Sequence, residues 1–419
     1  MPSRILKFIA LVFLSLLLEA PYFARALPTQ LSAPPENNIS ASVAAQRALV
    51  DSLYYEFDRW FEIFDERIAF LEAQPESRDN TMERMRFYFA YAGLLGEVSH
   101  TLAFTSQYKI DSVAKPFSYY SEMAKKTARE IIDRDDASPS EKAEAYMYLG
   151  GAEGYIAIFE YGQGDLVSAL INGLQADGHL EKALDLDSRF VDSNFGLGMY
   201  RYGNSRLGGF GNFILQGGSD LRKEGLAHIE TALREDASSR PLVYKTLIWF
   251  NISEQINPAN ANLPKDHVLA PHNRRARVLE LLAEFKSAYF SDPARKDFIG
   301  NKEYFMMDAL QAMLDGRYRD GKAGFEKALE ICDYLIKVKK MPINPQLIRS
   351  VKAGIEFCEL MLMKPDESGD APLCLKVSQH LDFLKNGGAM LEYDSKKIQR
   401  ELQDVFTEAL KKFSNKNHC

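Results

Sequence analysis

Two histidines and an aspartate form the most prominent donor set in this chain. His267 and His272 lie five positions apart in a polar stretch that also contains Asp266. Such donors can bind zinc and related ions, but two ligands on one helix face lie three or four positions apart. The alternative is a solvated loop, and the other histidines are scattered. We therefore predict no metal site.

A glycine-rich stretch, 203–218, is the next candidate because glycine loops can hold phosphates. Gly209 and Gly211 begin a GxGxxG pattern, but position 214 is not glycine, and no GxxxxGK[ST] occurs. Glycines here more simply allow tight turns and close approach of the backbone. The GxSxG and HExxH patterns are also absent. We expect no catalytic residue, no cofactor and no enzyme activity.

The chain opens with the features of a secretory signal peptide. Arg4 and Lys7 form a positive region, an apolar run follows, and small residues occupy the cleavage positions of "ARA". The run is shorter than the ~20 residues of a membrane-spanning helix, although a membrane anchor is the alternative. We expect removal of residues 1–26, a flexible lead-in over 27–42, and an exported chain without a stable membrane anchor. The expected location is the periplasm of a Gram-negative bacterium, with secretion as the alternative.

The charge balance excludes one large class of partners. The chain carries a net charge of −7, and nucleic acids require a basic footprint. The densest basic cluster, Arg274, Arg275 and Arg277, is better explained as a solvated helix start. We therefore predict that the chain binds no nucleic acid.

The cysteines allow a disulfide, since exported proteins meet an oxidising compartment. Residues 364–370 have the composition of a turn between two helices, and Cys358 and Cys374 are equally distant from its centre. Equal distances bring residues together in an antiparallel pair. We predict a Cys358–Cys374 bridge, with buried free thiols as the alternative.

Apolar residues recur at three- and four-residue steps almost throughout, which predicts an all-α fold. Ser138, followed three residues later by Glu141, is a capping box that begins a helix. Pro116 is expected to open another. The predicted divisions are an N-terminal helical capping region (43–135), a repeat region (136–335) and a C-terminal helical region (336–419).

One short design recurs along the repeat region: a large apolar residue is followed three positions later by Ala and then by Leu. Leu-Gly pairs at 149–150 and 197–198, which are 48 residues apart, mark the preceding helices. A further unit is expected near residue 280, where 275–285 has a helical pattern. The alanines of the design are Ala183, Ala232 and Ala328.

These repeats resemble the tetratricopeptide repeat family, in which small residues let antiparallel helices approach closely. The resemblance covers roughly 140–335. It implies a right-handed superhelix of antiparallel helix pairs, an α-solenoid in which neighbouring pairs bury a continuous core. The best match carries Phe305, Ala309, Gly321, Phe325 and Ala328.

The repeats differ from the family by extra residues between the paired helices. Units 144–187 and 192–236 contain about 14 and about 15 additional residues, and 253–273 is expected to be a third insertion. Insertions at equivalent positions fall on one face of an array, and loops on rigid scaffolds often carry binding function. The alternative is that they only extend the edge of the array.

The resemblance also implies a partner-binding groove, because inner-helix side chains of tetratricopeptide proteins contact partner peptides. The alternative for Phe195 and Tyr202 is a place in the core between repeats. The paired Lys/Asn pattern that binds a C-terminal carboxylate in chaperone-binding members is absent. The candidate groove residues are Glu144, Met147, Asp192, Phe195, Met199 and Tyr202.

Three functions remain open from the sequence. The leading hypothesis is a non-enzymatic exported scaffold that binds a protein partner. The second is a small-molecule-binding component associated with a solute-transport system, in which the insertions enclose a ligand. The third is a cell-envelope enzyme on a helical array, which only the expected location supports.

Overall fold

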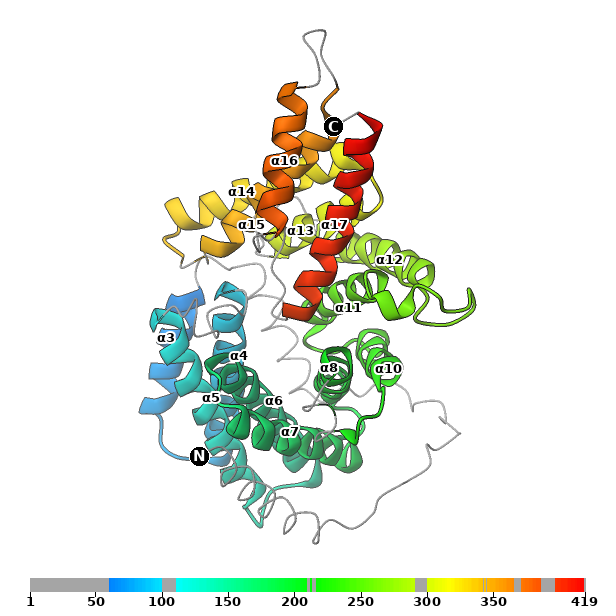
Figure 1. Cartoon of the computed structure of the whole chain (residues 1–419). Helices are drawn as coiled ribbons and strands as arrows, with labels where there is room; N and C mark the ends of the chain where they lie inside the picture. The colour runs from blue at the N-terminus through cyan, green and yellow to red at the C-terminus, as the bar shows by residue number, and fades with distance from the viewer. Residues whose placement is uncertain are drawn as a thin grey trace, which may run out of the picture. The chain divides into compact units, whose positions relative to one another are not determined.

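The computed structural model describes residues 60–99, 111–208, 212, 216–290, 300–341, 343, 345–364, 371–385 and 396–417. These residues form fourteen α-helices and one short 3-10 helix, with no strand among them (Figure 1), so the all-α prediction is confirmed. The helices are α3 (Trp60–Ala73), α4 (Arg78–Ser99), α5 (Asp111–Ile132), α6 (Pro139–Gln163), α7 (Leu166–Leu186), α8 (Asp192–Leu207), α10 (Arg222–Arg234), α11 (Arg240–Gln255), η3 (Pro258–Asn260), α12 (Pro271–Tyr289), α13 (Gly300–Leu314), α14 (Tyr318–Lys337), α15 (Pro345–Leu362), α16 (Ala371–Lys385) and α17 (Lys396–Lys416).

Two predicted helix starts have different outcomes. The capping box is confirmed, because the Ser138 side chain accepts a hydrogen bond from the Glu141 amide while the Glu141 side chain accepts one from the Ser138 amide. The prediction that Pro116 opens a helix is wrong, since α5 already runs from Asp111 and contains this proline. Proline removes its own amide bond, but the helix continues on both sides.

The predicted repeats are helix pairs in the structure: α6 packs on α7, α8 on α10, α11 on α12, and α13 on α14. In the first pair, Asn172 donates to Glu160 at 2.9 Å, and His179 Nδ1 lies 2.6 Å from Glu153. Residues progressively farther from the turn therefore meet each other, which defines an antiparallel pair. Consecutive pairs also touch through α7–α8, α10–α11 and α12–α13. The right-handed superhelix stays a prediction.

Small residues lie where paired helices approach most closely. The repeat alanines Ala183, Ala232 and Ala328 are completely buried. A Cβ atom at Gly198 would lie 2.6 Å from the Gly225 carbonyl oxygen, and one at Gly225 would lie 2.8 Å from that of Gly198. The backbones of α8 and α10 thus pack directly against each other. In a close-packed interior such an approach leaves no room for a side chain, so both positions require glycine.

The α13–α14 pair has the same kind of contact. A Cβ atom at Gly321 would lie 3.2 Å from the Ala309 carbonyl oxygen, and one at Gly324 would lie 2.9 Å from Ala309 Cβ. Phe325 is fully buried and fills the space toward α15, where Gly354 faces its ring. The residues behind the family resemblance therefore serve helix packing.

The first predicted insertion is not a loop. α6 ends at Gln163 and α7 begins at Leu166, with only Gly164, in the left-handed region at φ 85°, and the N-cap Asp165 between them. The additional residues lengthen both helices, because continued hydrogen bonding within a helix satisfies the backbone better than an irregular loop. The other two insertions fall where predicted, between α8 and α10 and between α11 and α12.

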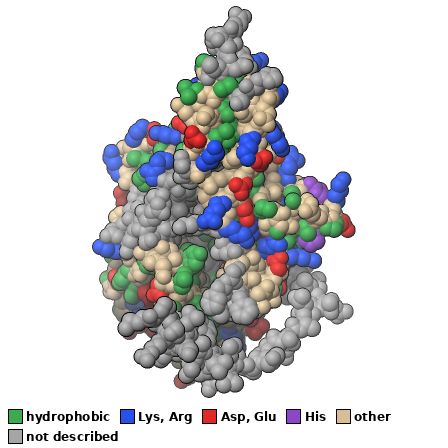
Figure 2. Space-filling view, in the orientation of Figure 1, with side chains coloured by type: hydrophobic (Ala, Val, Ile, Leu, Met, Phe, Trp, Pro, Cys, Tyr) green, Lys and Arg blue, Asp and Glu red, His purple; other side chains and the backbone are tan. Residues whose placement is uncertain are grey.

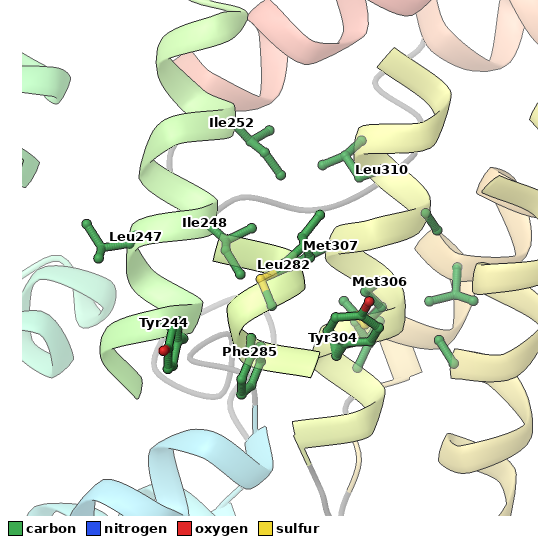
Figure 3. Close-up of a cluster of buried hydrophobic side chains, with 14 of the residues drawn as sticks. Tyr244, Leu247, Ile248, Ile252, Leu282, Phe285, Tyr304, Met306, Met307 and Leu310 are labelled. Atoms are coloured by element: carbon green, nitrogen blue, oxygen red, sulfur yellow. The ribbon is translucent and has the colours of Figure 1, made fainter. Parts of the chain in front are cut away.

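The largest group of buried apolar side chains extends across consecutive pairs. Figure 3 shows Tyr244, Ile248 and Ile252 of α11 pointing toward α12 and α13. The rings of Tyr244 and Phe285 stack at a centroid distance of 5.4 Å. A continuous core of this kind means that no pair buries its apolar face alone.

The predicted Cys358–Cys374 bridge is wrong. Cys358 and Cys332 are buried free thiols, whereas Cys374 is disulfide-bonded. Equal spacing about a turn was an insufficient criterion, because the thiol of Cys358 lies against α14, close to Gly321. Burial raises the pKa of Cys332 to about 11 and that of Cys358 to about 12.

Within the described residues, none of the helices has both the length and the apolar character needed to cross a bilayer. The expected signal peptide and lead-in, residues 1–42, lie outside the described part of the chain.

Candidate functional site

A group of exposed apolar side chains covers the lengthened ends of α6 and α7, which lie side by side in Figure 1. Their exposed fractions range from 43 to 61%. Exposed apolar residues are usual when single, but a group on adjacent helix ends is typical of an interaction site. We name this group the α6–α7 patch: Ile158, Tyr161, Leu166, Val167, Ile171 and Leu174.

The first half of helix α7 has its larger apolar residues on the outside. Its buried side there carries the small or polar residues Asn172, Gly173 and Ala176, and only farther along does it bury a large one, Leu180. Ile171 and Leu174 face solvent. A helix that only stabilises its own fold normally has the opposite arrangement. Ile171 and Leu174 contribute nothing to the core in this arrangement. Contact with a partner molecule would explain their exposure.

The charged side chains that α6 and α7 themselves place next to the patch are acidic, whereas the nearby Lys125 of α5 donates to Asn172 at 3.0 Å. Glu160 and Asp165 lie within its sequence, and residues 166–176 contain no charge at all. Asp165 is fixed as the N-cap of α7, where its carboxylate accepts from the Ser168 amide. Burial raises the pKa of Glu160, although a hydrogen bond from Asn172 opposes this. The patch is therefore an apolar surface with an acidic border.

A cleft of about 470 Å³ begins where the patch ends. Leu174 belongs to both, and the cleft is further lined by Tyr146, Gln175, Gly178 and His179. The rings of Tyr146 and His179 lie 5.7 Å apart. The cleft thus combines an apolar wall with an aromatic and an imidazole ring, a mixture typical of small-ligand sites.

Glu153 holds His179 in a fixed orientation. This carboxylate is completely buried, and His179 Nδ1 lies 2.6 Å from it. Arg129 and Lys125 approach the same carboxylate to 3.4 and 4.0 Å. An ionised carboxylate only accepts hydrogen bonds, so Nδ1 donates and Nε2 is left to meet a ligand in the cleft.

Three of the predicted groove residues are buried. Glu144 accepts two hydrogen bonds from Arg86, at 2.6 and 2.9 Å. Met147 lies in a core cluster, and Tyr202 donates from its hydroxyl to Glu254 at 2.9 Å. Because these side chains are inside the fold, they offer no open surface to a partner peptide.

The remaining predicted groove residues are also used within the fold. Asp192 accepts hydrogen bonds from the amides and hydroxyls of Ser238 and Ser239, immediately before α11. Phe195 and Met199 are half-buried and pack on the main core. Phe195 and Tyr202 therefore match the alternative of core between repeats. The α6–α7 patch was not predicted, although the uncharged stretch 166–176 was a visible sign of it.

Tyr202 contacts a buried cluster of charged side chains through its hydrogen bond to Glu254. Arg206 is 2% exposed and lies between Glu254 of α11 and Glu401 of α17. Arg206 also donates to Ser253, at 2.9 Å to the hydroxyl and 3.0 Å to the carbonyl. Arg222 donates to the other oxygen of Glu254 at 2.7 Å. The cluster is saturated by its own members, so its geometry fits a structural connection better than an open binding site.

Figure 2 shows acidic and basic side chains mixed on the visible face, with the histidines over the α11–α12 loop. His267 and His272 are both exposed there. In the described part of the chain, no group of three or more His, Cys, Asp or Glu side chains is placed to hold a metal ion.

A second histidine is held neutral by its neighbours. His228 Nδ1 lies 2.9 Å from the Asn194 side-chain oxygen, and its Nε2 lies 2.8 Å from Arg201 Nη1. Nε2 must therefore accept while Nδ1 donates, which is the neutral form. Burial lowers the pKa of His228, and Arg201 lowers it further, against opposing effects of Glu224 and Glu181.

This arrangement predicts a loss of stability in mild acid. The unfolded chain binds a proton near the ordinary histidine pKa of 6.5, whereas folded His228 does so only at lower pH. The free energy of unfolding should therefore decrease as pH falls from about 7 to about 5. His380, whose pKa burial also lowers, contributes in the same direction. Urea titrations across this range should show a smaller decrease for His228→Gln than for the unchanged protein, and equal slopes would contradict the prediction.

Comparisons with known proteins found no relative: no family model, no curated protein and no solved structure matches this chain. Function is therefore inferred from the chain's own residues.

Proposed function

We propose that this protein is a non-enzymatic, exported, tetratricopeptide-like scaffold that binds another protein through the α6–α7 patch. The observation that carries the proposal is the outward placement of six large apolar side chains on two lengthened helices. Export enters the proposal through the leader-like residues 1–26. The patch lies on the first of the three sequence insertions, which were expected to carry binding function.

The border of the patch indicates the chemistry of the partner. Glu160 and Asp165 flank it, and residues 166–176 carry no Lys or Arg. Helices that lie on membranes usually have a basic polar face that is attracted to anionic lipid. An acidic border instead favours a protein whose apolar contact surface is surrounded by Lys and Arg, because complementary charges speed and orient association.

The test introduces one charge at the centre of the patch. Ile171→Asp should abolish partner binding, because a carboxylate would have to be desolvated in an apolar interface. Leu375→Asp on α16 is the matched control, since Leu375 is 60% exposed and also apolar. Neither change should alter the folded content seen by circular dichroism, because both side chains face solvent.

The experiment measures two things: whether each variant retains the partner, and whether the partner lies next to position 171. A photo-reactive amino acid at position 171 should cross-link in the native host to a protein that the Leu375→Asp chain retains and the Ile171→Asp chain loses. The same probe at position 375 should not reach that protein. Cross-linking from both positions, or equal retention by both variants, would overturn the proposal.

A second function, binding of a small molecule, is favoured by the cleft beside His179. The half-exposed Arg129 guanidinium would bind the carboxylate of a hydroxy acid, His179 Nε2 would accept a hydrogen bond from its hydroxyl group, and Tyr146 and Leu174 would contact its apolar part. Native mass spectrometry of protein isolated from its host should then show an adduct that His179→Phe removes. If neither the unchanged protein nor the His179→Phe variant shows an adduct, the small-molecule function is contradicted and only the scaffold function remains.

A further inference from the structure

Helix α17 has a second apolar seam in addition to the one that anchors it. Leu402, Phe406 and Leu410 are buried in the core, where Phe406 meets Phe357 at a ring distance of 5.2 Å. Val405, Ala409 and Phe413, spaced four residues apart, are only half-buried. They form a separate line along the helix, since residues four apart lie on one face.

This line is one wall of an open cleft of about 670 Å³. The opposite wall is formed by Ile256 and Pro258, which follow α11, together with Tyr318 of α14 and Met361 of α15. Both walls are predominantly apolar. A cleft of this size accommodates side chains from a packed helix rather than a whole helix, whose diameter is about 10 Å.

The charges along this cleft change sign halfway along α17. Asp404 and Glu408 lie toward the N-terminal half, and Lys412 and Lys416 toward the C-terminal half. Figure 2 shows acidic and basic side chains together over this helix. Glu408 also pairs with Lys411 on its own helix at 2.7 Å, but exposed pairs of this kind contribute little and can rearrange. Glu401 is already held by Arg206 and takes no part.

We infer that a second copy of this chain occupies the cleft, with the two α17 helices antiparallel about a two-fold axis near Ala409. Reversal of the helix places Asp404 opposite the copy's Lys416 and Glu408 opposite the copy's Lys412. A parallel arrangement would instead set like charges beside each other. The surface is therefore complementary to itself, which is the requirement for a two-fold interface.

The apolar line fits the same arrangement. The charge pairs centre the axis on position 410, one residue beyond Ala409, so Val405 lies beside the copy's Phe413 with an offset of two residues along the helix, and a large side chain meets a smaller one at each end. Ala409 lies next to the crossing, where a small residue permits the closest approach of the two helices. This interface is separate from the α6–α7 patch and does not depend on the proposed function.

The experiment reverses the charges in two different chains. Light scattering after size-exclusion chromatography should give twice the chain mass for the unchanged protein. Asp404→Lys/Glu408→Lys makes the cleft wholly basic, and Lys412→Glu/Lys416→Glu makes it wholly acidic. Each variant alone should be monomeric, with a dissociation constant raised by more than about tenfold, because four like charges then face each other.

Mixing the two variants provides the decisive result. The basic chain and the acidic chain should form a heterodimer with the mass of two chains, and a chain carrying all four reversals should again form homodimers. Circular dichroism checks that each exposed variant is folded. A monomeric unchanged protein, dimeric single-sign variants, or a mixture that fails to pair would each overturn the inference. Monomers that sediment with anionic vesicles would instead assign the cleft to a lipid surface.

Discussion

Replacing Arg206 by methionine is expected to lower the free energy of unfolding by about 3–5 kcal/mol, because a buried carboxylate loses its partner. Arg206 contacts both Glu254 and Glu401 inside the fold. Burial lowers the pKa of Arg206, but the hydrogen bond to Glu401 together with the electrostatic effects of Tyr202, Glu401 and Glu254 raises it above its ordinary value, so the guanidinium stays charged. Methionine has a similar length and no charge, so packing is changed less than electrostatics.

A double-mutant cycle measures the coupling within this cluster. Urea unfolding of Arg206→Met, Glu401→Gln and the combined variant should show that the combined loss is smaller than the sum of the single losses. Arg189→Met is the control, since Arg189 pairs with Asp187 at a side-chain exposure of 56% and should lose less than about 1 kcal/mol. Equal losses of unfolding free energy in Arg206→Met and Arg189→Met would show that the buried cluster stabilises the fold no more than an exposed ion pair does.

Gly198→Ala should have the second-largest effect, with a loss of about 3 kcal/mol of unfolding free energy from overpacking. The added Cβ atom would lie 2.4 Å from Ile229 Cγ1 and 2.6 Å from the Gly225 carbonyl oxygen. The backbone oxygen cannot rotate away, so α8 and α10 must separate. Thermal unfolding followed by circular dichroism measures the loss.

The same helix provides a control of opposite sign. Gly203 also lies in α8, and a Cβ atom there would meet no atom within 4 Å. Gly203→Ala should therefore raise stability by about 0.5–1 kcal/mol, because alanine loses less backbone entropy in a helix. If Gly203→Ala also lowers stability, the assumed gain from helix propensity in α8 is wrong, and the loss at Gly198 can no longer be assigned to the contact with α10 alone.

Local patterns in the sequence predicted the helix pairs well. The capping box at Ser138 and the repeated alanines depend on neighbours within a few positions or on one close contact, and such rules hold wherever the residues occur. The predicted packing role of Gly321 is confirmed for the same reason. Even the units with long insertions keep Gly150 and Gly198 at positions where a Cβ atom would clash with the paired helix.

The candidate site was harder to predict because it depends on which helix face is covered. Tyr202 and Met147 were assigned to a groove by register, but neighbouring helices bury both of them. Ile171 and Leu174 would be assigned to a core by hydropathy, yet Gly173 and Ala176 occupy that side of α7. Burial of this kind is decided by tertiary packing, which a single helix pattern does not contain.

Arg206 and Glu401, whose side chains meet in the interior, are 195 positions apart in the chain. At about 5–20 residues per second, a ribosome adds that interval in roughly 10–40 seconds. Once α11 is synthesised within this interval, Arg206 has Glu254 but still lacks Glu401. The central pairs therefore reach full stability only when α17 arrives, and Lys397 then adds a bond to the Arg206 carbonyl oxygen. Completion of this buried cluster therefore depends on the synthesis of α17, and a copy truncated before Glu401 lacks one of the two carboxylates that hold Arg206.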